Sequence, residues 1–536
     1  MHLFKLSKNI FYLYLPIIVG FIFELVFCDF YVYRIFNVVE NLIFATILAF
    51  IVELSKNKKL QSFIYILLLL LVFFESGYFL IFRAPFSASG IFILLDTNLT
   101  EASEFLSFYS TPKIIFLLFT FIFLFLIKNK IRNLLFTNLT WTPLIKIVFI
   151  LSITLLTTSI ITKPYLKSQN LPFLLLQSSI IYKKQMEHYH SFSKKLNSDV
   201  FSDIKKNSEK NKKELHFILI GESTSRKHFY SASNYYRNTT PLLDSLSTEV
   251  TFFNNVISPE TFTRGSLLQV LTLANTKNLN PKKNGSVLQM LNKAGYKTFW
   301  FSNQRSVSKH DTEITAIANG ASFFKAISTD HEKFSTPLDG ELLPLLEITK
   351  KDNSNKKVVF LHLQGTHLDY KKRYPKEFIF FTKTPKTKFH SKRNNLLINA
   401  YDNAIRYQDY IISECITFLK KENINNSTLL YFSDHGEEVF DNINFAGHAV
   451  DGIRTKNMYE IPFVYWSSKK FRHNIKLNSG KPYVIDNLIH SIAHLLDIKC
   501  REIDISKSIF NKKNDSTNIK QIRLKGELFI FNEVFK

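Results

Sequence analysis

Residue types that often decide a fold are scarce in this chain. Only three Cys occur among 536 residues, and they are too few for a small disulfide-rich scaffold and too widely spaced for a Cys-based zinc site. Gly and Pro number 15 each, which excludes a collagen-like chain, while the abundance of apolar residues excludes a disordered one. Globular and membrane architectures remain.

Apolar and charged residues are both plentiful. The chain has 53 Phe, 46% hydrophobic residues, and 68 Lys+Arg against 44 Asp+Glu. A chain of this length is too long for one ordinary domain, and the Phe residues crowd toward the N-terminus, so a single soluble globule is excluded. Residues 166–536 carry a net charge of +19. A basic domain suggests an anionic partner such as lipid head groups, lipopolysaccharide or nucleic acid, although general compositional drift would give the same excess.

Five apolar stretches in the first 163 residues predict a transmembrane domain. Each approaches the roughly 20 residues that span a bilayer. The first is no cleavable signal, because its apolar run is long and no small-residue cleavage site follows. The expected spans are 10–28, 38–54, 61–83, 113–127 and 144–162.

Lys and Arg in the short loops predict the orientation of these spans. Basic residues are enriched in cytoplasmic loops, and an odd number of spans then places everything after residue 163 on the far side, which in a bacterium is the periplasm. The predicted protein is therefore a multi-pass inner-membrane protein. The basic loop residues are Lys5, Lys8, Lys56, Lys58, Lys59, Lys128, Lys130, Arg132 and Lys146.

Three segments are neither clear membrane spans nor part of an alternating strand and helix pattern. The loop 84–112 contains a short amphipathic pattern that predicts either an interfacial helix or a plain connector. Residues 171–189 are apolar and then mixed, which favours an interfacial helix over a sixth span. Residues 202–214 are Lys-rich and predict a linker. We therefore treat 164–214 as an interfacial helix and linker.

Residues 215–536 predict an α/β domain with a mainly parallel sheet, because short apolar runs alternate with longer helical patterns. The expected helices are 285–295 and 399–421. The expected strands are 215–220, 251–257, 296–302, 357–363, 427–433 and 461–466.

Chemically reactive side chains follow several of these strands directly. Glu222 follows the first strand, the segment HLQGTH with His367 follows the fourth, and Asp434 and His435 follow the fifth. Thr263 comes shortly after the strand at 251–257. Ligands of such sheets bind beyond the carboxyl ends of the strands, and carboxylates mixed with imidazole suit Zn or Mn better than Ca or Mg.

In these segments the chain resembles the bacterial phosphoethanolamine transferases, and among them it is most similar to the branch that acts on the lipopolysaccharide core. The resemblance implies five spans and an outward domain of alkaline phosphatase or sulfatase type. It covers nearly the whole outward domain in the right order, whereas the membrane half matches only in span count and in the loop DTNLTEASEF. The matching segments are GESTSR, YYRNTTP, FFNNVIS, TFTRGSLLQVLTLAN, AGYKTFWFSNQ, HLQGTHLDYKKRYP, YDNAIRYQD, YFSDHGEEV and MYEIPFVYW.

The resemblance implies a role for each matching residue. Thr263 is the implied nucleophile and a zinc ligand, and the other implied ligands are Glu222, Asp434 and His435. His367 and, through the segment FAGHAV, His448 match histidines that contact the transferred phosphate. One zinc ion is expected, and a second metal is left open.

The same resemblance has two departures. Asn234 stands where the family usually has Gly, at a position that we expect to be left-handed. The three Cys, which are Cys28, Cys415 and Cys500, cannot form the several disulfides of the lipid A-specific branch, and whether two of them pair is left open.

The implied reaction moves phosphoethanolamine from phosphatidylethanolamine to lipopolysaccharide through a covalent intermediate on Thr263. The expected partners are the donor lipid, the lipopolysaccharide acceptor and membrane lipids, and no nucleic acid. A zinc ion makes a hydroxyl a usable nucleophile at neutral pH. Lipid A phosphate, core heptose or its phosphate, and surface proteins all remain open as acceptors.

Other functions fit the sequence less well. A sulfatase needs Cys or Ser in a C/S-x-P-x-R segment, and no Cys lies near Thr263. A phosphoglycerol transferase of the lipoteichoic-acid type shares the spans and the threonine nucleophile and is the alternative enzyme. A membrane sensor or scaffold is the alternative outside enzymes, and it should lack a complete ligand set.

Overall fold

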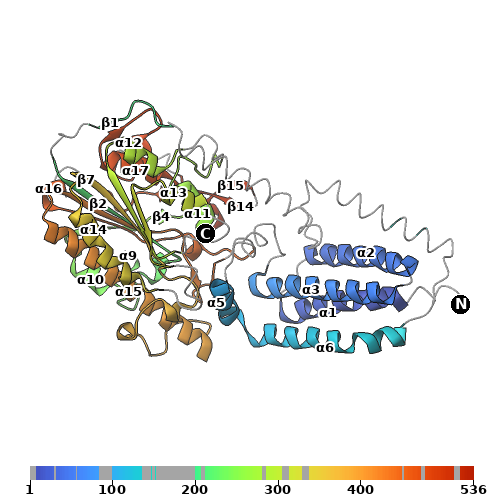
Figure 1. The fold of residues 1–536 in the computed structure, drawn as a ribbon. Helices are drawn as coiled ribbons and strands as arrows, with labels where there is room; N and C mark the ends of the chain where they lie inside the picture. The colour runs from blue at the N-terminus through green and yellow to red at the C-terminus, as the bar shows by residue number, and fades with distance from the viewer. Residues whose placement is uncertain are drawn as a thin grey trace. The chain divides into compact units, whose positions relative to one another are not determined.

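The structure is a computed structural model, and its described residues form two compact units (Figure 1). The first unit contains the N-terminal helices, and the second contains the α/β domain together with residues Asn98–Glu104. The structure describes most of residues 8–135 and 200–535 and positions 147 and 151. The gaps inside these ranges are 29–31, 56, 84–98, 207–211, 280–284, 305–312, 329–336, 449–451, 473–476, 512–518 and 525.

Four helices correspond to the first four expected spans. They are α1 (Lys8–Phe27), α2 (Val32–Ser55), α3 (Lys58–Phe82) and α6 (Pro112–Leu135). Among the described residues, two helices are long and apolar enough to cross a membrane, namely α3 and residues Pro112–Ile131 of α6. The fifth expected span, 144–162, lies outside the described residues apart from two isolated positions.

Buried polar side chains connect the helices of this unit. Glu75 on α3 accepts hydrogen bonds from Asn37 and Asn41 on α2, the second at 3.0 Å. Ser76 donates to Glu24 on α1 at 2.8 Å. Buried carboxylates away from water need such partners, so these contacts fix how α1, α2 and α3 face one another.

The loop 84–112 contains a helix, α5 (Leu99–Tyr109). The amphipathic pattern there is therefore helical rather than a plain connector, and its place at the membrane surface stays a prediction. The second expected interfacial helix, 171–189, lies outside the described residues.

The α/β domain is built on a seven-stranded sheet in the order β3-β11-β8-β2-β7-β5-β6. The strands β8, β2, β7, β5 and β6 run parallel, and β11 is antiparallel to both β8 and β3. The mainly parallel sheet is thus confirmed. Its strands are β2 (Glu214–Gly221), β3 (Val250–Phe253), β5 (Lys297–Ser302), β6 (Phe323–Ala326), β7 (Lys356–His362), β8 (Asn426–Ser433) and β11 (Phe463–Ser467).

Side chains alternate between the two faces of this sheet, and both faces are covered by helices (Figure 1). Ile218 and Ile220 of β2 join the larger core with α11 (Thr263–Val270), α12 (Val287–Lys293) and α17 (Leu488–Leu495). Phe217 points to the other face, where its ring stacks on Phe418 of α15 (Lys392–Glu422) at 5.8 Å. Burial on both faces explains why the parallel strands are almost continuously apolar.

Several predicted boundaries change. The predicted strand 251–257 is divided by Asn254 and Asn255 into β3 and β4 (Val256–Ile257), and β4 pairs with β12 (Tyr483–Val484) instead of the main sheet. The predicted helix 399–421 starts earlier, because Ser391 caps the backbone N–H of Asn394.

The predicted linker 202–214 is partly packed into the α/β domain. Lys205–Lys206 form β1, which pairs with β13 (Ile498–Lys499), and the preceding residue Phe201 is buried in the core. The α/β domain therefore begins before residue 215, since Phe201 and β1 are part of it. Asn234 has φ of 55°, so the expected left-handed position is confirmed. All three Cys are free.

Candidate active site

The carboxyl ends of three neighbouring strands carry the site. In the register of the sheet, Gly221 of β2 stands opposite Ser433 of β8, and Ile220 stands opposite His362 of β7. The backbone pairing continues past the strands, since Asp434 N–H donates to the Gly221 carbonyl at 3.0 Å. Thr366 N–H likewise donates to the carbonyl of Glu222 at 3.0 Å. These hydrogen bonds fix the direction in which the loops after β7 and β8 leave the sheet.

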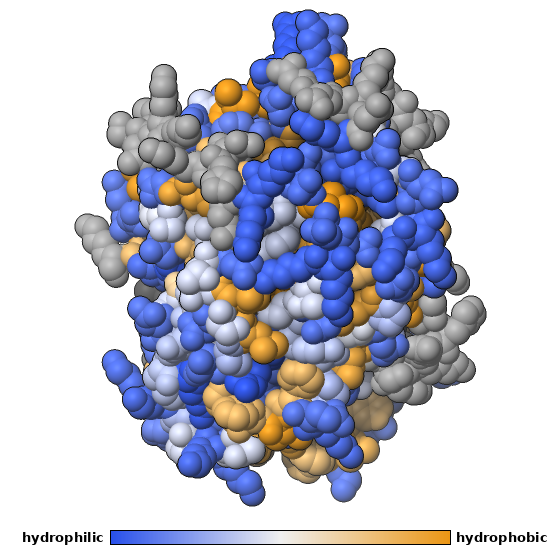
Figure 2. All heavy atoms as spheres, turned by 90° about the vertical axis from the view of Figure 1, so that its left-hand side faces the viewer, coloured by the Kyte–Doolittle hydropathy of each residue, from blue (hydrophilic) through white to orange (hydrophobic). Residues whose placement is uncertain are grey.

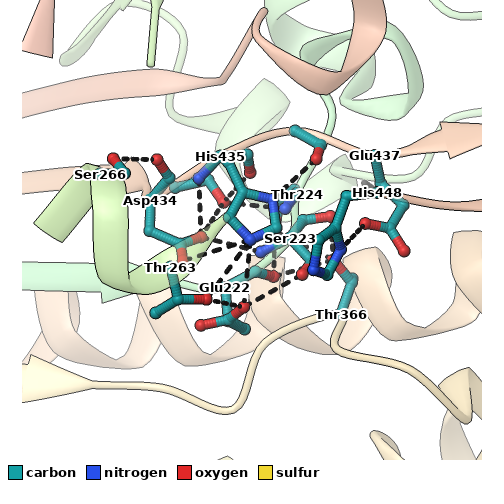
Figure 3. Close-up of polar contacts among 12 residues, drawn as sticks. Glu222, Ser223, Thr224, Thr263, Ser266, Thr366, Asp434, His435, Glu437 and His448 are labelled. Carbon is teal, nitrogen blue, oxygen red and sulfur yellow. Dashed lines mark hydrogen bonds and ion pairs between the residues drawn. The ribbon is translucent and has the colours of Figure 1, made fainter. Parts of the chain in front are cut away.

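Thr263 reaches this edge from a different element. It is the first residue of α11, after the extended N-cap residue Phe262. Its Oγ1 donates to Glu222 Oε1 at 2.8 Å and lies 3.4 Å from His435 Nε2 (Figure 3). The N-terminus of a helix carries a partial positive charge that stabilises anions, so a negatively charged oxygen on Thr263 is favoured there.

Hydrogen bonds leave one free ligand atom on each of two neighbouring side chains. His435 Nδ1 bonds the carbonyl of Gly436 at 2.9 Å, which leaves Nε2 as the free lone pair. Asp434 Oδ1 accepts from the backbone N–H groups of Ser223 at 3.0 Å and His435 at 2.7 Å. Asp434 Oδ2 is buried without a hydrogen-bond partner. Both free atoms therefore remain for a further ligand.

The free atoms are spaced as a zinc ion requires. His435 Nε2 is 3.5 Å from Glu222 Oε1 and 3.5 Å from Asp434 Oδ2, and the three ligand atoms all lie within 4.8 Å of one another. Tetrahedral ligands about 2.0 Å from an ion stand about 3.3 Å apart. Glu222, Asp434 and His435 can therefore hold a zinc ion, with Thr263 beside it.

The pKa values of these residues reflect the close approach of two buried carboxylates. Burial and the nearby Glu222 carboxylate raise the pKa of Asp434 above its ordinary value. Burial opposes the charged form of His435, but Asp434 and Glu222 outweigh it and raise its pKa, so a metal ion at Nε2 would take the place of a proton. With both carboxylates ionised, Glu222 and Asp434 would place two negative charges beside the imidazole of His435, and a divalent cation would compensate them.

His448 is held beside His435 by a buried carboxylate. Its Nδ1 lies 2.9 Å from Glu437 Oε2, and the other oxygen of Glu437 accepts from the Tyr370 hydroxyl at 2.8 Å. The rings of His448 and His435 are 4.3 Å apart. Glu437 is fully buried, so it fixes the ring of His448 and leaves Nε2 free. His435, Glu437 and His448 also form a second group of potential ligands within 4.8 Å.

His367 lies on the loop after β7, and Arg373 clamps the backbone of that loop. The Arg373 guanidinium donates from Nε to the carbonyls of His367 and Leu368, both at 3.2 Å, and from Nη2 to Leu368 at 2.6 Å. Glu104, from the segment Asn98–Glu104, forms a buried ion pair with Arg373. His367 Nδ1 has no hydrogen-bond partner, and burial lowers the pKa of His367, so the ring is neutral.

Two glycines allow the loops to approach this closely. Gly365 has φ of 58°, and a Cβ there would lie 2.6 Å from the backbone oxygen of Glu222. A Cβ on Gly436 would lie 2.0 Å from the backbone oxygen of Asn457. Any larger residue at either position would displace a loop that carries site residues.

The structure thus brings Glu222, Thr263, Asp434 and His435 together, with His448 beside them. The sequence did not single out Glu437, Arg373 or Glu104, although each lies in a segment that matched the family. Two adjacent glutamates in SDHGEE offered a signal, but only the fold shows that Glu437, and not Glu438, contacts His448.

Comparisons with known proteins agree with this geometry. Residues 215–498 match the Sulfatase family model, so the chain belongs to the sulfatase family. Within that family it belongs to the phosphoethanolamine transferases. It is 31% identical to the crystallised periplasmic domain of EptC from Escherichia coli in complex with Zn, covering 62% of this chain and 96% of that domain, with a TM-score of 0.58.

Two further relatives extend over most of the chain. The chain is 29% identical to phosphoethanolamine transferase EptC of Escherichia coli strain K12 over 486 residues, which is 82% of this chain and 80% of that protein. The integral membrane lipooligosaccharide phosphoethanolamine transferase A of Neisseria meningitidis has a TM-score of 0.67 at 20% identity, covering 88% of this chain and 90% of that one. The fold similarity therefore includes the N-terminal helices.

Proposed function

We propose that this protein is a zinc-dependent phosphoethanolamine transferase of the bacterial inner membrane. It takes phosphoethanolamine from phosphatidylethanolamine and transfers it to lipopolysaccharide. The observation that carries the proposal is the position of Thr263, whose hydroxyl lies at a helix N-terminus beside Glu222, Asp434 and His435. The family membership supports the same donor group.

In the first half of the proposed reaction, Thr263 Oγ1 attacks the phosphorus of phosphatidylethanolamine. The bond between phosphorus and the diacylglycerol oxygen breaks, and that oxygen leaves with a proton. Thr263 then carries phosphoethanolamine as a phosphate ester. When bound, zinc offsets the carboxylate charges and lowers the pKa of a hydroxyl beside it.

In the second half, an oxygen of the acceptor attacks the same phosphorus. The bond to Thr263 breaks, and the threonine hydroxyl is restored by a proton. His448, oriented by Glu437, and His367, on the loop held by Arg373, are placed to hydrogen-bond the phosphoryl oxygens and to move the protons at the leaving oxygens.

The proposed topology has five spans, with the α/β domain in the periplasm. The basic loops 56–59 and 128–132 support a cytoplasmic side for the ends of the spans that they connect. This arrangement keeps the site near the head groups of the donor lipid. We propose the lipopolysaccharide core as the acceptor region, because the chain lacks the Cys needed for the disulfides of the lipid A-specific branch.

Mass spectrometry of lipopolysaccharide from cells with and without the gene tests this function. We expect a phosphoethanolamine increment that requires the gene, that fragmentation locates in the core, and that a Thr263→Ala copy does not restore. A glycerophosphate increment would instead support the alternative phosphotransferase. Unchanged lipopolysaccharide would refute the proposed acceptor.

A further inference from the structure

An ordered loop of unusual composition follows the turn that carries His367. Residues 371–393, which we call the Phe380 loop, contain nine Lys or Arg and one acidic residue, Glu377. Apart from short 3-10 turns at Tyr370–Lys372 and Lys376–Phe378, the loop has no regular structure before α15 begins. Long ordered loops of this kind are usually functional.

Two adjacent apolar side chains of this loop project into solvent. Ile379 is 53% exposed and Phe380 is 61% exposed. Most of the face shown in Figure 2 is hydrophilic, with apolar side chains interspersed among the polar ones. A neighbouring ring, Tyr236, is 41% exposed and its hydroxyl accepts from the backbone N–H of Lys386 at 2.8 Å. Such an apolar group within a polar surface marks an interaction site.

The backbone beneath these side chains is fixed from inside the domain. The buried Asn403 of α15 accepts hydrogen bonds from the N–H groups of Phe380 at 3.0 Å and Phe381 at 2.8 Å. Phe378 packs its ring on Tyr407 and Tyr410, at 4.7 and 5.4 Å. The exposure of Ile379 and Phe380 is therefore built into the loop.

Lysines precede and follow the exposed apolar pair along the loop, and one of them, Lys372, is paired with Asp369 at 2.9 Å. The exposed Lys residues of the loop are Lys371, Lys372, Lys376, Lys383, Lys386, Lys388 and Lys392. The Arg406 guanidinium lies over the Phe380 ring at 4.0 Å. Apolar side chains that enter a bilayer, surrounded by cations that reach phosphates, are the features of proteins that bind anionic membrane surfaces.

We propose that the Phe380 loop docks the catalytic domain on a bilayer that contains anionic phospholipid. Ile379 and Phe380 enter the region between head groups and acyl chains, and the lysines contact lipid phosphates. A phosphorylated sugar would satisfy the lysines but would give no reason to expose Ile379. Because Arg373 connects the start of the loop to the backbone of His367, docking also fixes the site close to the membrane surface.

Nitroxide accessibility in the full-length protein tests this docking without any measurement of activity. Cys28 and Cys500 are replaced by Ser, the buried Cys415 is retained, and a spin label is placed through Phe380→Cys. The protein is reconstituted in nanodiscs of phosphatidylcholine with or without phosphatidylglycerol. Ile505→Cys is the control, because Ile505 is 49% exposed and lies outside the loop.

We expect the label at position 380 to be more accessible to oxygen than to a water-soluble nickel chelate, and more so with phosphatidylglycerol. The label at position 505 should show the opposite preference in both lipids. Lys383→Glu with Lys386→Glu should weaken the preference at position 380, whereas Lys469→Glu with Lys470→Glu, exposed lysines on α16 (Lys469–Arg472), should not.

Equal chelate accessibility at positions 380 and 505 in anionic nanodiscs would overturn the proposal. If the label at position 380 becomes protected only after lipopolysaccharide is added, the loop binds the acceptor and the membrane proposal is wrong.

Discussion

Buried carboxylates lie at both ends of strand β2, and the groups that surround them differ. At its start, Glu214 is surrounded by the Lys206 ammonium at 2.5 Å, the Tyr296 hydroxyl and the His216 ring at 3.5 Å. Beyond its end, Glu222 stands beside a second carboxylate, Asp434, and the imidazole of His435.

The pKa values show the difference. Burial would raise the pKa of Glu214, but its hydrogen bonds from His216, Lys206 and Tyr296 outweigh burial and lower it to about 2. The pKa of Glu222 is also lowered, against burial, by its hydrogen bond to His435 and the charge of that ring. The difference falls on its neighbour Asp434, whose pKa is raised by burial and by Glu222. Buried charge alone therefore does not mark a reactive site in this domain. The reactive site is marked instead by two adjacent carboxylates, one of which has a buried oxygen, Asp434 Oδ2, without a hydrogen-bond partner.

The largest effect is expected at the nucleophile. Thr263→Ala should lower transfer by about a thousandfold or more, because the hydroxyl that forms the covalent bond is lost. Thr261→Ala is the matched control, since Thr261 is a buried threonine two residues away. Activity should be followed with purified enzyme and phosphatidylethanolamine, and folding by thermal unfolding. Near-normal activity of Thr263→Ala would remove Thr263 from the mechanism.

Metal content should separate the two ends of β2. Asp434→Asn should lower zinc affinity by about a hundredfold or more, and activity with it, since one of three protein ligands is weakened. Glu214→Gln should keep zinc and lower the free energy of unfolding by about 3 kcal/mol, because it breaks a buried ion pair. Elemental analysis and denaturant unfolding of both variants check this. Loss of zinc in Glu214→Gln would contradict the comparison.

A smaller loss of rate is expected where the phosphate is contacted. His367→Ala should keep zinc and lower kcat, by about 10- to 100-fold. Arg373→Lys should keep zinc and lower kcat less than His367→Ala does, because an ammonium lacks the planar fork that lets Nε and Nη2 of Arg373 bind the loop carbonyls and Glu104 from separate nitrogens. If His367→Ala loses zinc as fully as Asp434→Asn does, His367 is a metal ligand.

The titration of Glu214 should leave activity at neutral pH unchanged and should alter only the free energy of unfolding at acidic pH. Its pKa is near 4.5 in the unfolded chain and about 2 in the folded one, so its contribution is complete above pH 4.5 and is lost as the pH falls toward 2. That contribution is about 3 kcal/mol. Urea unfolding should show the wild type approaching Glu214→Gln over this range. A constant difference between the two would contradict the account.

The sequence predicts most of the sheet and the residues at its edge, for a physical reason. Strands buried on both faces are apolar runs, and polar residues directly after such runs are visible without a structure. The antiparallel direction of β11 is not visible, because pairing with β3 and β8 is decided by contacts far apart in the chain. Strand β6 is short, and its pattern FFKA is partly exposed at the sheet edge.

The residues that orient the site cannot be predicted from the sequence, for a related reason. Arg373 acts on the backbone of His367 and pairs with Glu104, which lies 269 residues earlier. Nothing in the local pattern of either segment indicates that contact. Residues that would touch the substrate follow strand ends, whereas residues that orient them depend on how distant loops meet.

The central claim is that Thr263 carries the phosphoethanolamine group. Intact-mass analysis of full-length protein incubated with phosphatidylethanolamine in the absence of acceptor tests it most directly, with peptide mapping to locate any adduct. The account predicts one phosphoethanolamine increment on Thr263, absent from Thr263→Ala and released on addition of lipopolysaccharide. An adduct on another residue, or rapid transfer with no adduct during turnover, would contradict it.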